Sequence, residues 1–299
     1  MTGTVLIAGA NGNFGRHAAR AFEKAGWTVR RHSRGTDMAA AAEGADVIVN
    51  GLNPPMYHNW PVLIPRITEE VIAAARASGA TVLVPGNVYV YGRQPGPWTE
   101  ETPHVPASRK GRVRAAMERT YRAASADGVR VILLRAGDFI DPGNPNTLFG
   151  MAVFRGLKRG RMTTLGGMDV RRSYAYLPDM ARAAVALAER RESLAAFEAV
   201  NMPGYTFSMA ELKARTERLL GRPLKVGRFP WWALRLASPV WELAREMSEM
   251  RYLYETSHEL GGDRFRQLLP GFEAAPLDAV IAAHLPAARP SGAGVQAAA

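Results

Sequence analysis

The chain contains no cysteine among its 299 residues. A disulfide framework, a thiolate nucleophile and a sulfur-ligated metal site are therefore excluded, and nothing in the composition favours an oxidising compartment. The sequence also lacks a run of ~18 uninterrupted apolar residues, which a membrane-spanning helix would need. Its first residues, MTGTVLIAGA, lead into a strand-like stretch without a basic segment followed by a long apolar one. We expect a cytoplasmic protein with no integral membrane segment.

Several catalytic motifs are missing as well. The six histidines show no paired spacing typical of metal ligands, so no metal site is expected. The sequence has no G-x-S-x-G nucleophile elbow, and its glycine-rich stretch is not followed by the lysine and hydroxyl residue of a P-loop. Metallohydrolases, serine hydrolases and P-loop nucleotidases are thereby excluded.

Acidic residues are outnumbered, and the net charge is +11 with a pI of about 10.3. The cations lie in four separate groups, at 30–34, 109–114, 155–161 and 215–228, with acidic and apolar residues between them. No stripe of alternating aromatic and basic residues accompanies them, so we expect no nucleic-acid partner. Two interpretations remain for these cations, a solvated surface or a phosphate-bearing small molecule.

Short β-branched runs alternate with helical patterns in the first half of the chain. Strands are predicted at 4–9, 28–33, 46–51, 81–86 and 130–137, and helices at 14–25, 63–77 and 110–126. This alternation is typical of βαβ units. The predicted fold class is α/β, a Rossmann-like doubly wound parallel sheet with a smaller C-terminal α/β substrate domain.

The pattern loosens after Pro142. A helix is expected at 147–158, strands at 173–177 and 197–201, a helix at 178–190, and another opening at Ser208, which forms a capping box with Glu211. We assign residues 1–142 mainly to the dinucleotide-binding domain and 143–285 mainly to substrate binding, with 173–190 returning to the first part. Residues 286–299 have the composition of a disordered tail.

A tryptophan-rich segment, FPWWALRLASPVWELAREM, carries Trp231, Trp232 and Trp241. A packed helix of the smaller domain is one interpretation. The segment could instead line an apolar substrate pocket, or lie on a membrane surface with Arg235 and Arg245 toward lipid headgroups.

The stretch AGANGNFG places three glycines between the first strand and the first helix. Such glycines allow a tight turn and let backbone amides approach a pyrophosphate at the positive end of the helix. The spacing is G-x-x-G-x-x-G, one residue longer than the common fingerprint. The expected cofactor-binding residues here and after the third strand are Gly9, Asn11, Gly12, Asn13, Phe14, Gly15, Gly51, Leu52 and Asn53.

The second strand ends in RRHSR, without the acidic residue that binds the adenosine ribose in NAD-preferring sites. Cations and a hydroxyl at this position suit a 2′-phosphate. We therefore predict NADP in preference to NAD, with Ser33 and Arg34 as phosphate ligands; the alternative is that the arginines are merely exposed.

Together with the glycine loop, the segments ADVIVNGLNPP, VLVPGNVYVYG, TEETPHVP and VILLRAGDFIDP follow one another in the order of a known family. The chain resembles an extended short-chain dehydrogenase/reductase of the NAD-dependent epimerase/dehydratase family. RRSYAYLPDMARAAVAL and the segment from VNMPG onward extend the similarity to about residue 285. The resemblance implies hydride transfer at a carbonyl or carbinol, and homodimers formed through the helices at 63–77 and 110–126.

The family's catalytic tyrosine, lysine and Ser/Thr are all replaced. Aligning the motifs puts Asn87 at the Ser/Thr position and Lys110 and Arg114 at the tyrosine and lysine positions. Asn87 can still donate a hydrogen bond to a developing oxyanion. An arginine does not exchange protons, so Lys110 is the candidate acid/base of the pair. Lys110 could instead anchor the nicotinamide ribose or lie on the surface.

Helical periodicity predicts where Lys110 and Arg114 lie on their helix. Val113, Met117, Thr120 and Ala124 define the expected buried stripe, with Lys110 and Arg114 flanking it. On a solvated face, Arg114 would pair with Glu118 one turn on. Other proton donors in loops at the carboxyl ends of the strands are Tyr57, His58, Tyr89, Tyr91 and Asp138.

The predicted function is thus NADP(H)-dependent oxidoreductase or epimerase/dehydratase chemistry on a small carbonyl or alcohol, with an apolar substrate as one option. The alternative is a non-catalytic NADP-binding regulator that senses redox state, which the missing tyrosine favours.

Overall fold

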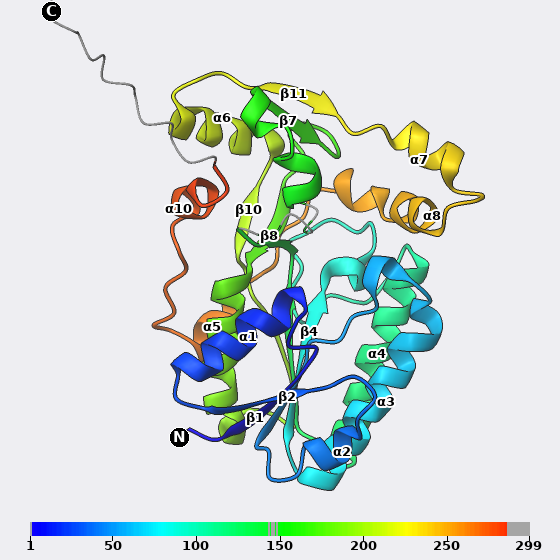
Figure 1. Ribbon diagram of the computed structural model, residues 1–299, viewed down its shortest axis with the longest axis vertical. Helices are drawn as coiled ribbons and strands as arrows, with labels where there is room; N and C mark the ends of the chain where they lie inside the picture. The colour runs from blue at the N-terminus through cyan, green and yellow to red at the C-terminus, as the bar shows by residue number, and fades with distance from the viewer. Residues whose placement is uncertain (1, 143, 145–146, 148, 286–299) are drawn as a thin grey trace, which may run out of the picture.

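The computed structural model describes residues 2–142, 144, 147 and 149–285. Its centre is a six-stranded parallel sheet in the order β2-β1-β3-β4-β5-β9, with helices on both faces (Figure 1). The strands are β1 (Thr4–Ala8), β2 (Thr28–His32), β3 (Val47–Asn50), β4 (Thr81–Asn87), β5 (Val131–Ala136) and β9 (Phe197–Asn201). The predicted Rossmann-like parallel sheet is confirmed.

The sheet is held by apolar strands that are covered on both faces. Every residue of β3 and β5 is buried, as expected for near-continuous β-branched and aliphatic runs between two helical layers. By contrast, β2 is an edge strand, and three of its five residues are exposed. The arginines of β2 can therefore face solvent without disrupting the core.

Four long helices cover the sheet. α1 (Asn13–Lys24) and α5 (Leu177–Glu189) pack on one face, and α3 (Trp60–Ser78) and α4 (Arg109–Ala126) pack on the other. The short α2 (Met38–Ala41) lies beside α3, with Asp37 accepting a hydrogen bond from the Ala39 amide at its start. The helices predicted at 14–25, 63–77 and 110–126 are confirmed to within three residues at each end.

The smaller region lies above the sheet in the view of Figure 1. It contains a three-stranded sheet, β10-β8-β6, and a two-stranded sheet, β11-β7. The strands are β6 (Asp138–Ile140), β7 (Arg161–Thr164), β8 (Arg172–Tyr176), β10 (Tyr205–Phe207) and β11 (Lys225–Arg228). Its helices are α6 (Met209–Leu220), α7 (Trp231–Ala237), α8 (Glu242–Glu249) and α10 (Leu277–Ala282), with the 3-10 turns η4 (Leu157–Arg159) and η6 (Arg251–Tyr254). The main sheet and its helices carry the remaining short elements, which are α9 (Asp263–Leu268), packed against β9, and the 3-10 turns η1 (Pro55–Tyr57), η2 (Val88–Tyr91) and η5 (Arg191–Ser193).

The chain crosses between the two parts more than once. β8 belongs to the three-stranded sheet, whereas α5 packs against α1 on the main sheet and β9 becomes the main sheet's sixth strand. The division at residue 142 stays a prediction. The predicted tail, 286–299, lies outside the described residues.

The single helix expected at 147–158 is wrong. In its described part, the structure has a π-helical turn, η3 (Phe149–Val153), followed by the 3-10 turn η4. Glycines at 150 and 156 weaken a regular helix, and Gly160 ends η4 in the left-handed region at φ 69°. The apolar periodicity came from residues that pack into the small domain's core, among them Phe149, Val153 and Leu157.

The capping box that opens α6 is confirmed. The Ser208 hydroxyl accepts a hydrogen bond from the Glu211 amide, and the Glu211 carboxylate accepts one from the Ser208 amide at 2.7 Å. Four residues thus satisfy two backbone donors at a helix start, which is why a purely local signal suffices here.

The helix α4 buries part of the stripe that the periodicity predicts, together with a polar face beside it. Met117 and Ala124 are buried as expected, whereas Val113 is half-buried and Thr120 is exposed. Lys110, Arg114 and Glu118 are buried as well. Each buried charge has partners from another element, and these partners move the helix's buried face toward its polar residues. Arg114 does not pair with Glu118, which instead binds Arg135 on β5.

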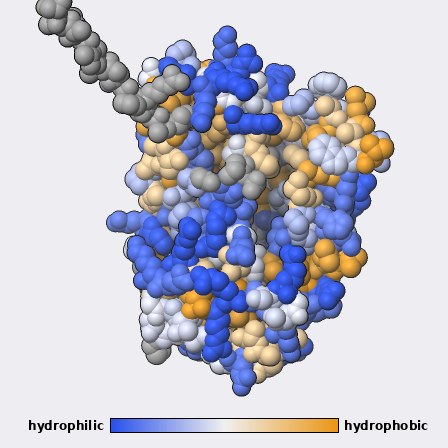
Figure 2. Space-filling view, in the orientation of Figure 1, coloured by the Kyte–Doolittle hydropathy of each residue, from blue (hydrophilic) through white to orange (hydrophobic). Residues whose placement is uncertain are grey.

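The tryptophan-rich segment forms a helical hairpin, with α7 followed by α8. No residue of α7 is buried, and apolar side chains gather over this hairpin at the upper right of Figure 2. Across the described residues, no helix has the length and apolar content needed to cross a bilayer.

A buried histidine makes stability depend on pH. His258 stacks on Trp98 with ring centroids 4.5 Å apart, and its Nδ1 donates to the Thr256 carbonyl. Among the described residues, its buried Nε2 has no hydrogen-bond partner. Burial, assisted by Arg172, lowers the pKa of His258 to about 4. A proton on Nε2 would therefore be buried without an acceptor.

A group with a depressed folded-state pKa contributes stability above its unfolded value, here 6.5, and loses it as pH falls through about 4. We expect His258 to account for a loss of about 3 kcal/mol in unfolding free energy across that window. Denaturant titrations at several pH values check this, because His258→Gln should flatten the dependence. An NMR-titrated pKa near 6 for His258 would contradict it.

Candidate cofactor and substrate cavity

The glycine loop is packed too closely for side chains. A Cβ at Gly15 would lie 2.1 Å from the Gly9 carbonyl oxygen, and Gly9 has φ 78° with Gly51 backbone atoms 2.8 Å from a Cβ position. The Gly12 amide donates to the Gly9 carbonyl at 2.9 Å and closes the turn. The close approach of backbone segments therefore requires glycine at both positions. Because no side chains stand there, the amino end of α1 is open toward the end of the sheet.

A cavity of about 510 Å³ adjoins this loop at the carboxyl ends of β1, β3, β4 and β5. Its walls come from the glycine loop, the turns after β3, β4 and β5, the helices α3 and α4, and the α7–α8 hairpin. The residues that line it include Gly12, Asn13, Asn53, Tyr57, Trp60, Asn87, Tyr89, Arg114, Asp138, Trp231, Leu243, Met247, Met250 and Tyr254. A volume of this size suits a small-molecule site, at the edge where open α/β sheets bind ligands.

The residues expected to bind the cofactor fall into three groups. Gly12, Asn13, Phe14, Gly51, Leu52 and Asn53 line the cavity. Gly9 and Gly15 shape the turn behind it, and Asn11 is exposed beside it. The residues predicted from the sequence therefore form most of one wall of the cavity. The part that each of them plays in cofactor binding stays a prediction.

The end of β2 lies on the open edge of the sheet. Ser33 and Arg34 are both exposed. Arg31 pairs with Glu23 at 2.6 Å and Arg30 donates to the Glu43 carbonyl, so these two cations are engaged. In the part of the chain that the structure describes, no carboxylate pairs with Arg34.

Asn87 lies at the end of β4 and lines the cavity. Its Oδ1 accepts a hydrogen bond from the Tyr89 amide at 3.0 Å, which caps η2. Its carbonyl accepts one from Arg135 at 2.8 Å. With Oδ1 engaged, the amide nitrogen is the group of Asn87 suited to donate to a ligand oxygen.

Arg114 forms part of the cavity wall. Its Nη2 donates to Asn53 Oδ1 at 2.7 Å, and the guanidinium lies 4.6 Å from the centre of the Trp60 ring. Burial lowers the pKa of Arg114, and Nε has no partner among the described residues. Arg114 therefore holds the turn after β3 in place and adds positive charge to the cavity.

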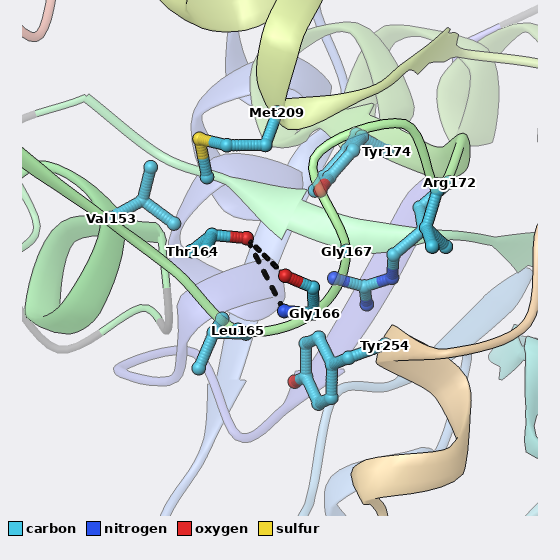
Figure 3. Close-up of a pocket in the computed structure, with 10 residues that line it drawn as sticks. Val153, Thr164, Leu165, Gly166, Gly167, Arg172, Tyr174, Met209 and Tyr254 are labelled. Carbon is cyan, nitrogen blue, oxygen red and sulfur yellow. Dashed lines mark hydrogen bonds between the residues drawn. The ribbon is translucent and has the colours of Figure 1, made fainter. Parts of the chain in front are cut away.

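An ion pair borders the cavity at Asp138. Arg172 on β8 binds Asp138, and its guanidinium lies 4.0 Å from the Tyr254 ring centre. Figure 3 shows Arg172 and Tyr254 beside a small adjoining hollow of about 20 Å³, which is room for about one water. The main cavity is therefore the only one of these two that could hold a substrate.

The amino end of α1 is tied to the segment after β6. Arg16 and His17 both bind the buried Asp141, the latter through Nε2 at 2.9 Å. Burial, together with the nearby Arg16 and Arg20, lowers the pKa of His17 to about 4. His17 is therefore neutral near pH 7 and donates to the carboxylate. No sequence pattern indicated this contact, which joins residues 124 positions apart.

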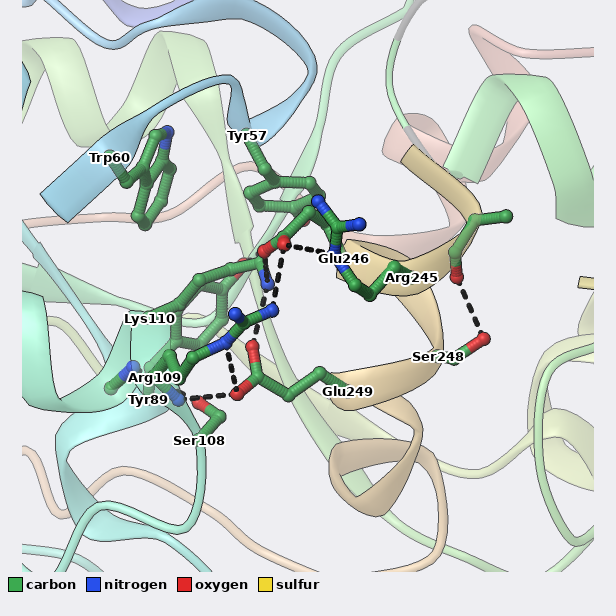
Figure 4. Close-up of polar contacts among 12 residues, drawn as sticks. Tyr57, Trp60, Tyr89, Ser108, Arg109, Lys110, Arg245, Glu246, Ser248 and Glu249 are labelled. Atoms are coloured by element: carbon green, nitrogen blue, oxygen red, sulfur yellow. Dashed lines mark hydrogen bonds and ion pairs between the residues drawn. The ribbon is translucent and has the colours of Figure 1, made fainter. Parts of the chain in front are cut away.

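Lys110 is held in an ion-pair network (Figure 4). Its Nζ lies 2.5 Å from Glu246 Oε2 and 2.9 Å from Glu249 Oε2, and its side chain is 2% exposed. Burial alone would raise the pKa of Glu249, but the Arg109 amide and Lys110 outweigh burial and lower it. Both carboxylates come from α8, so this network fastens the hairpin to the start of α4.

Lys110 does not line the cavity, and it is not a surface residue. Its ammonium lies 5.1 Å from the centre of the Tyr57 ring, which does line the cavity. These contacts favour a role in positioning α8 and Tyr57. A role as acid/base or as ribose anchor stays a prediction.

Two of the candidate proton donors meet in the cavity. The hydroxyl oxygens of Tyr57 and Tyr89 lie 3.5 Å apart. Burial raises the pKa of Tyr57 and raises that of Tyr89 well above its usual value, so both phenols are protonated at neutral pH. Tyr57 has φ 61°, in the left-handed region that non-glycine residues rarely adopt.

The remaining candidates are engaged elsewhere. The Tyr91 hydroxyl donates to the Thr99 carbonyl at 2.9 Å, and Tyr91 is not part of the cavity wall. His58 is exposed and contacts Glu242 at 3.0 Å. Asp138 lines the cavity but is paired with Arg172. The tyrosine pair is thus the best-placed source of a proton.

The tryptophan-rich segment contributes to this site. Trp231, Leu243 and Met247 line the cavity from the hairpin, and Trp231 Nε1 donates to the Leu165 carbonyl at 2.7 Å. An apolar pocket wall was one of the three interpretations of this segment. Trp231 fits it, whereas Trp232 and Trp241 are exposed.

Part of the chain is similar in sequence to known proteins. Residues 65–202 match the model of the NAD dependent epimerase/dehydratase family. An uncharacterized protein, y4nL, of Sinorhizobium fredii (strain NBRC 101917 / NGR234) is 30% identical over 154 residues, which are 48% of this chain and 42% of that protein. The match therefore spans less than half the length of this curated relative.

Solved structures share the fold. UDP-glucuronic acid 4-epimerase from Bacillus cereus, in complex with UDP-glucuronic acid and NAD, is 15% identical, with a TM-score of 0.75 over 94% of this chain and 97% of that one. RMD from Pseudomonas aeruginosa, complexed with NADPH, is 17% identical, with a TM-score of 0.72 over 95% and 97%. The family model supports the resemblance inferred from the sequence over residues 65–202, and the solved structures confirm the fold, while the replacement of the catalytic pair by Lys110 and Arg114 stays a prediction.

Proposed function

We propose that this chain, whose residues 65–202 belong to the NAD dependent epimerase/dehydratase family, is an NADP(H)-dependent oxidoreductase or epimerase that acts on a small carbonyl or alcohol. One observation carries the proposal: a single cavity joins the glycine loop to a pair of protonated tyrosines and to Asn87. A dinucleotide, a hydride acceptor and a proton source could meet there.

The glycine loop fits a dinucleotide. Its backbone is too tightly packed for side chains, so nothing stands between the amino end of α1 and a diphosphate. Gly12 and Asn13 would hold the diphosphate. Gly51, Leu52 and Asn53 would contact the nicotinamide half of the cofactor. When bound, the nicotinamide supplies or accepts a hydride. The chain's own residues must then supply the proton.

Tyr89 and Tyr57 are the proposed proton donors. One hydroxyl gives its proton to the substrate oxygen, and the other, 3.5 Å away, donates a hydrogen bond to the phenolate that forms. The nearby Arg114 stabilises that negative charge, while Lys110 holds the Tyr57 ring in position. Asn87 donates to the same substrate oxygen. Leu243, Met247 and Trp231 favour a substrate with an apolar part.

The proposed preference for NADP depends on Arg34. We expect Arg34→Glu to weaken NADPH binding about tenfold to a hundredfold, because a charge-assisted hydrogen bond to the 2′-phosphate is lost, while NADH binding stays within about twofold. Titration with each cofactor, followed by quenching of tryptophan fluorescence, measures both values. Arg20→Glu on α1 is the control of equal charge and exposure. An equal loss in both variants would contradict the assignment.

The same titrations test the proposed function as a whole. Tight NADPH binding together with reduction of at least one compound in a broad panel of carbonyls would support it. Failure to bind either nucleotide would overturn it.

A second candidate is a non-catalytic NADP-binding regulator. Lys110 stands at the position where the family has its tyrosine, and it is ion-paired with two carboxylates. This pairing favours a non-catalytic protein. Tight NADPH binding without hydride exchange on the whole panel would select this alternative. The proposed homodimer through α3 and α4 fits either function, and sedimentation velocity would test it.

A further inference from the structure

The α7–α8 hairpin presents an apolar outer surface that the site does not use. We define the outer patch as Trp232, Leu236, Val240 and Trp241, whose exposed fractions are 69%, 74%, 92% and 49%. Figure 2 shows apolar side chains gathered at the edge where α7 and its connection to α8 lie. Four large apolar side chains so close in the sequence are unusual on a free surface.

The hairpin is nevertheless well fastened. On its inner side Trp231 is anchored to the Leu165 carbonyl, and Lys110 holds Glu246 and Glu249 of α8. The outer patch is therefore the far side of an ordered element, whose inner side forms the cavity wall.

Charge is divided between the two sides of the hairpin. The three acidic side chains of α8 all have partners: Glu242 contacts His58, and Glu246 and Glu249 contact the cations Arg109 and Lys110. Arg228, at the end of β11, and Arg235, on α7, are exposed, and among the described residues neither has a carboxylate within ion-pair distance. The outer patch is thus apolar and bordered by uncompensated positive charge.

We propose that the outer patch docks on the surface of an anionic lipid bilayer. Tryptophans with aliphatic neighbours partition into the interface, and bordering arginines bind acidic headgroups. A second copy of the chain is a poorer occupant, because a two-fold contact through this patch would bring the same arginines of both copies together. A helix lying on the bilayer also needs no membrane-spanning length.

Docking would have a consequence for the cavity, which rests on the proposed function. Leu243 and Met247 line the cavity from the inner side of the same hairpin, so docking through the outer patch would hold the cavity close to the bilayer surface. An apolar carbonyl or alcohol dissolved in the membrane would then be concentrated near the site.

The test is co-sedimentation of the full chain with vesicles, without cofactor. We expect binding to vesicles of phosphatidylcholine mixed with phosphatidylglycerol, weakening as salt is raised, and little binding to phosphatidylcholine alone. The double variant Leu236→Glu/Val240→Glu should lose at least about tenfold in partitioning. Leu219→Glu, which changes an exposed leucine of α6 that is distant from the patch, is the matched control and should bind as wild type.

Arg235→Glu separates headgroup binding from apolar insertion. It should lower binding to the anionic vesicles about tenfold, whereas Arg20→Glu, an equal change of charge on α1, should lower it much less. A blue shift of tryptophan emission on vesicle binding, diminished in Trp232→Phe, would support insertion of the patch.

Other outcomes would overturn the proposal. These are absence of binding to anionic vesicles, equal binding by the double variant and wild type, or vesicle-independent dimerisation that the double variant abolishes, which would assign the patch to a second copy. NADPH affinity of each variant is measured in parallel. Vesicle binding without NADPH binding would support docking and overturn the proposed function. NADPH binding without vesicle binding would overturn docking and leave the proposed function standing.

Discussion

Tyr89→Phe is expected to slow hydride transfer by about 10²–10⁴-fold, because the variant removes a hydroxyl that we assign to general acid catalysis. Tyr57→Phe should have a similar effect, since the two hydroxyls lie 3.5 Å apart and act as one unit. NADPH affinity should change little in both variants. The measurement is single-turnover oxidation of bound NADPH by whichever carbonyl compound the wild-type protein reduces.

The neighbouring Tyr91 supplies a matched control. It belongs to the same turn, η2, but its hydroxyl donates to the Thr99 carbonyl and does not line the cavity. Tyr91→Phe should therefore retain hydride transfer even if it lowers stability by about 1 kcal/mol. Full activity in both Tyr57→Phe and Tyr89→Phe would exclude the tyrosine pair. Activity lost in Lys110→Met at unchanged stability would return the role to Lys110.

Glu118→Leu is expected to lower the free energy of unfolding by about 3–5 kcal/mol, because it leaves the Arg135 guanidinium buried without its counter-ion. The two side chains form a bidentate pair with both N–O distances at 2.8 Å, and they are 3% and 5% exposed. Denaturant unfolding, followed by circular dichroism, measures the change.

Two comparisons make this result specific. Glu70→Leu breaks the exposed pair with Arg66 and should cost at most about 0.5 kcal/mol. Adding Arg135→Met to Glu118→Leu removes the orphaned charge and should recover part of the loss, although Arg135 also binds Asn87 and Asn201. If the double variant is less stable than Glu118→Leu alone, the unpaired charge is not the cause.

The parts of the fold that the sequence predicted well have local causes. Strands β1, β3, β4 and β5 are continuous apolar runs, and the glycine loop and the capping box at Ser208 each encode their geometry within a few residues. The predicted helix at 147–158 failed because glycines outweighed apolar spacing. Periodicity records only the spacing of apolar residues and does not include the low helix propensity of glycine.

The site shows where such reasoning stops. Motif position singled out Lys110, but its partners on α8 lie 136 and 139 positions away in the chain. Tyr57 and Tyr89 were each candidates, and only the packing of the turns after β3 and β4 brings their hydroxyls together. The division of the hairpin into a cavity wall and an outer patch likewise depends on which side faces the sheet.

By itself, the sequence determined the parallel α/β fold, the tight glycine loop and the absence of thiol chemistry, because these follow from periodicity, glycine placement and composition. Only the tertiary structure decided which charges are paired, which tyrosines share the cavity and which tryptophans remain exposed. Those outcomes depend on contacts between residues distant in the chain, whose desolvation and pairing no local pattern encodes.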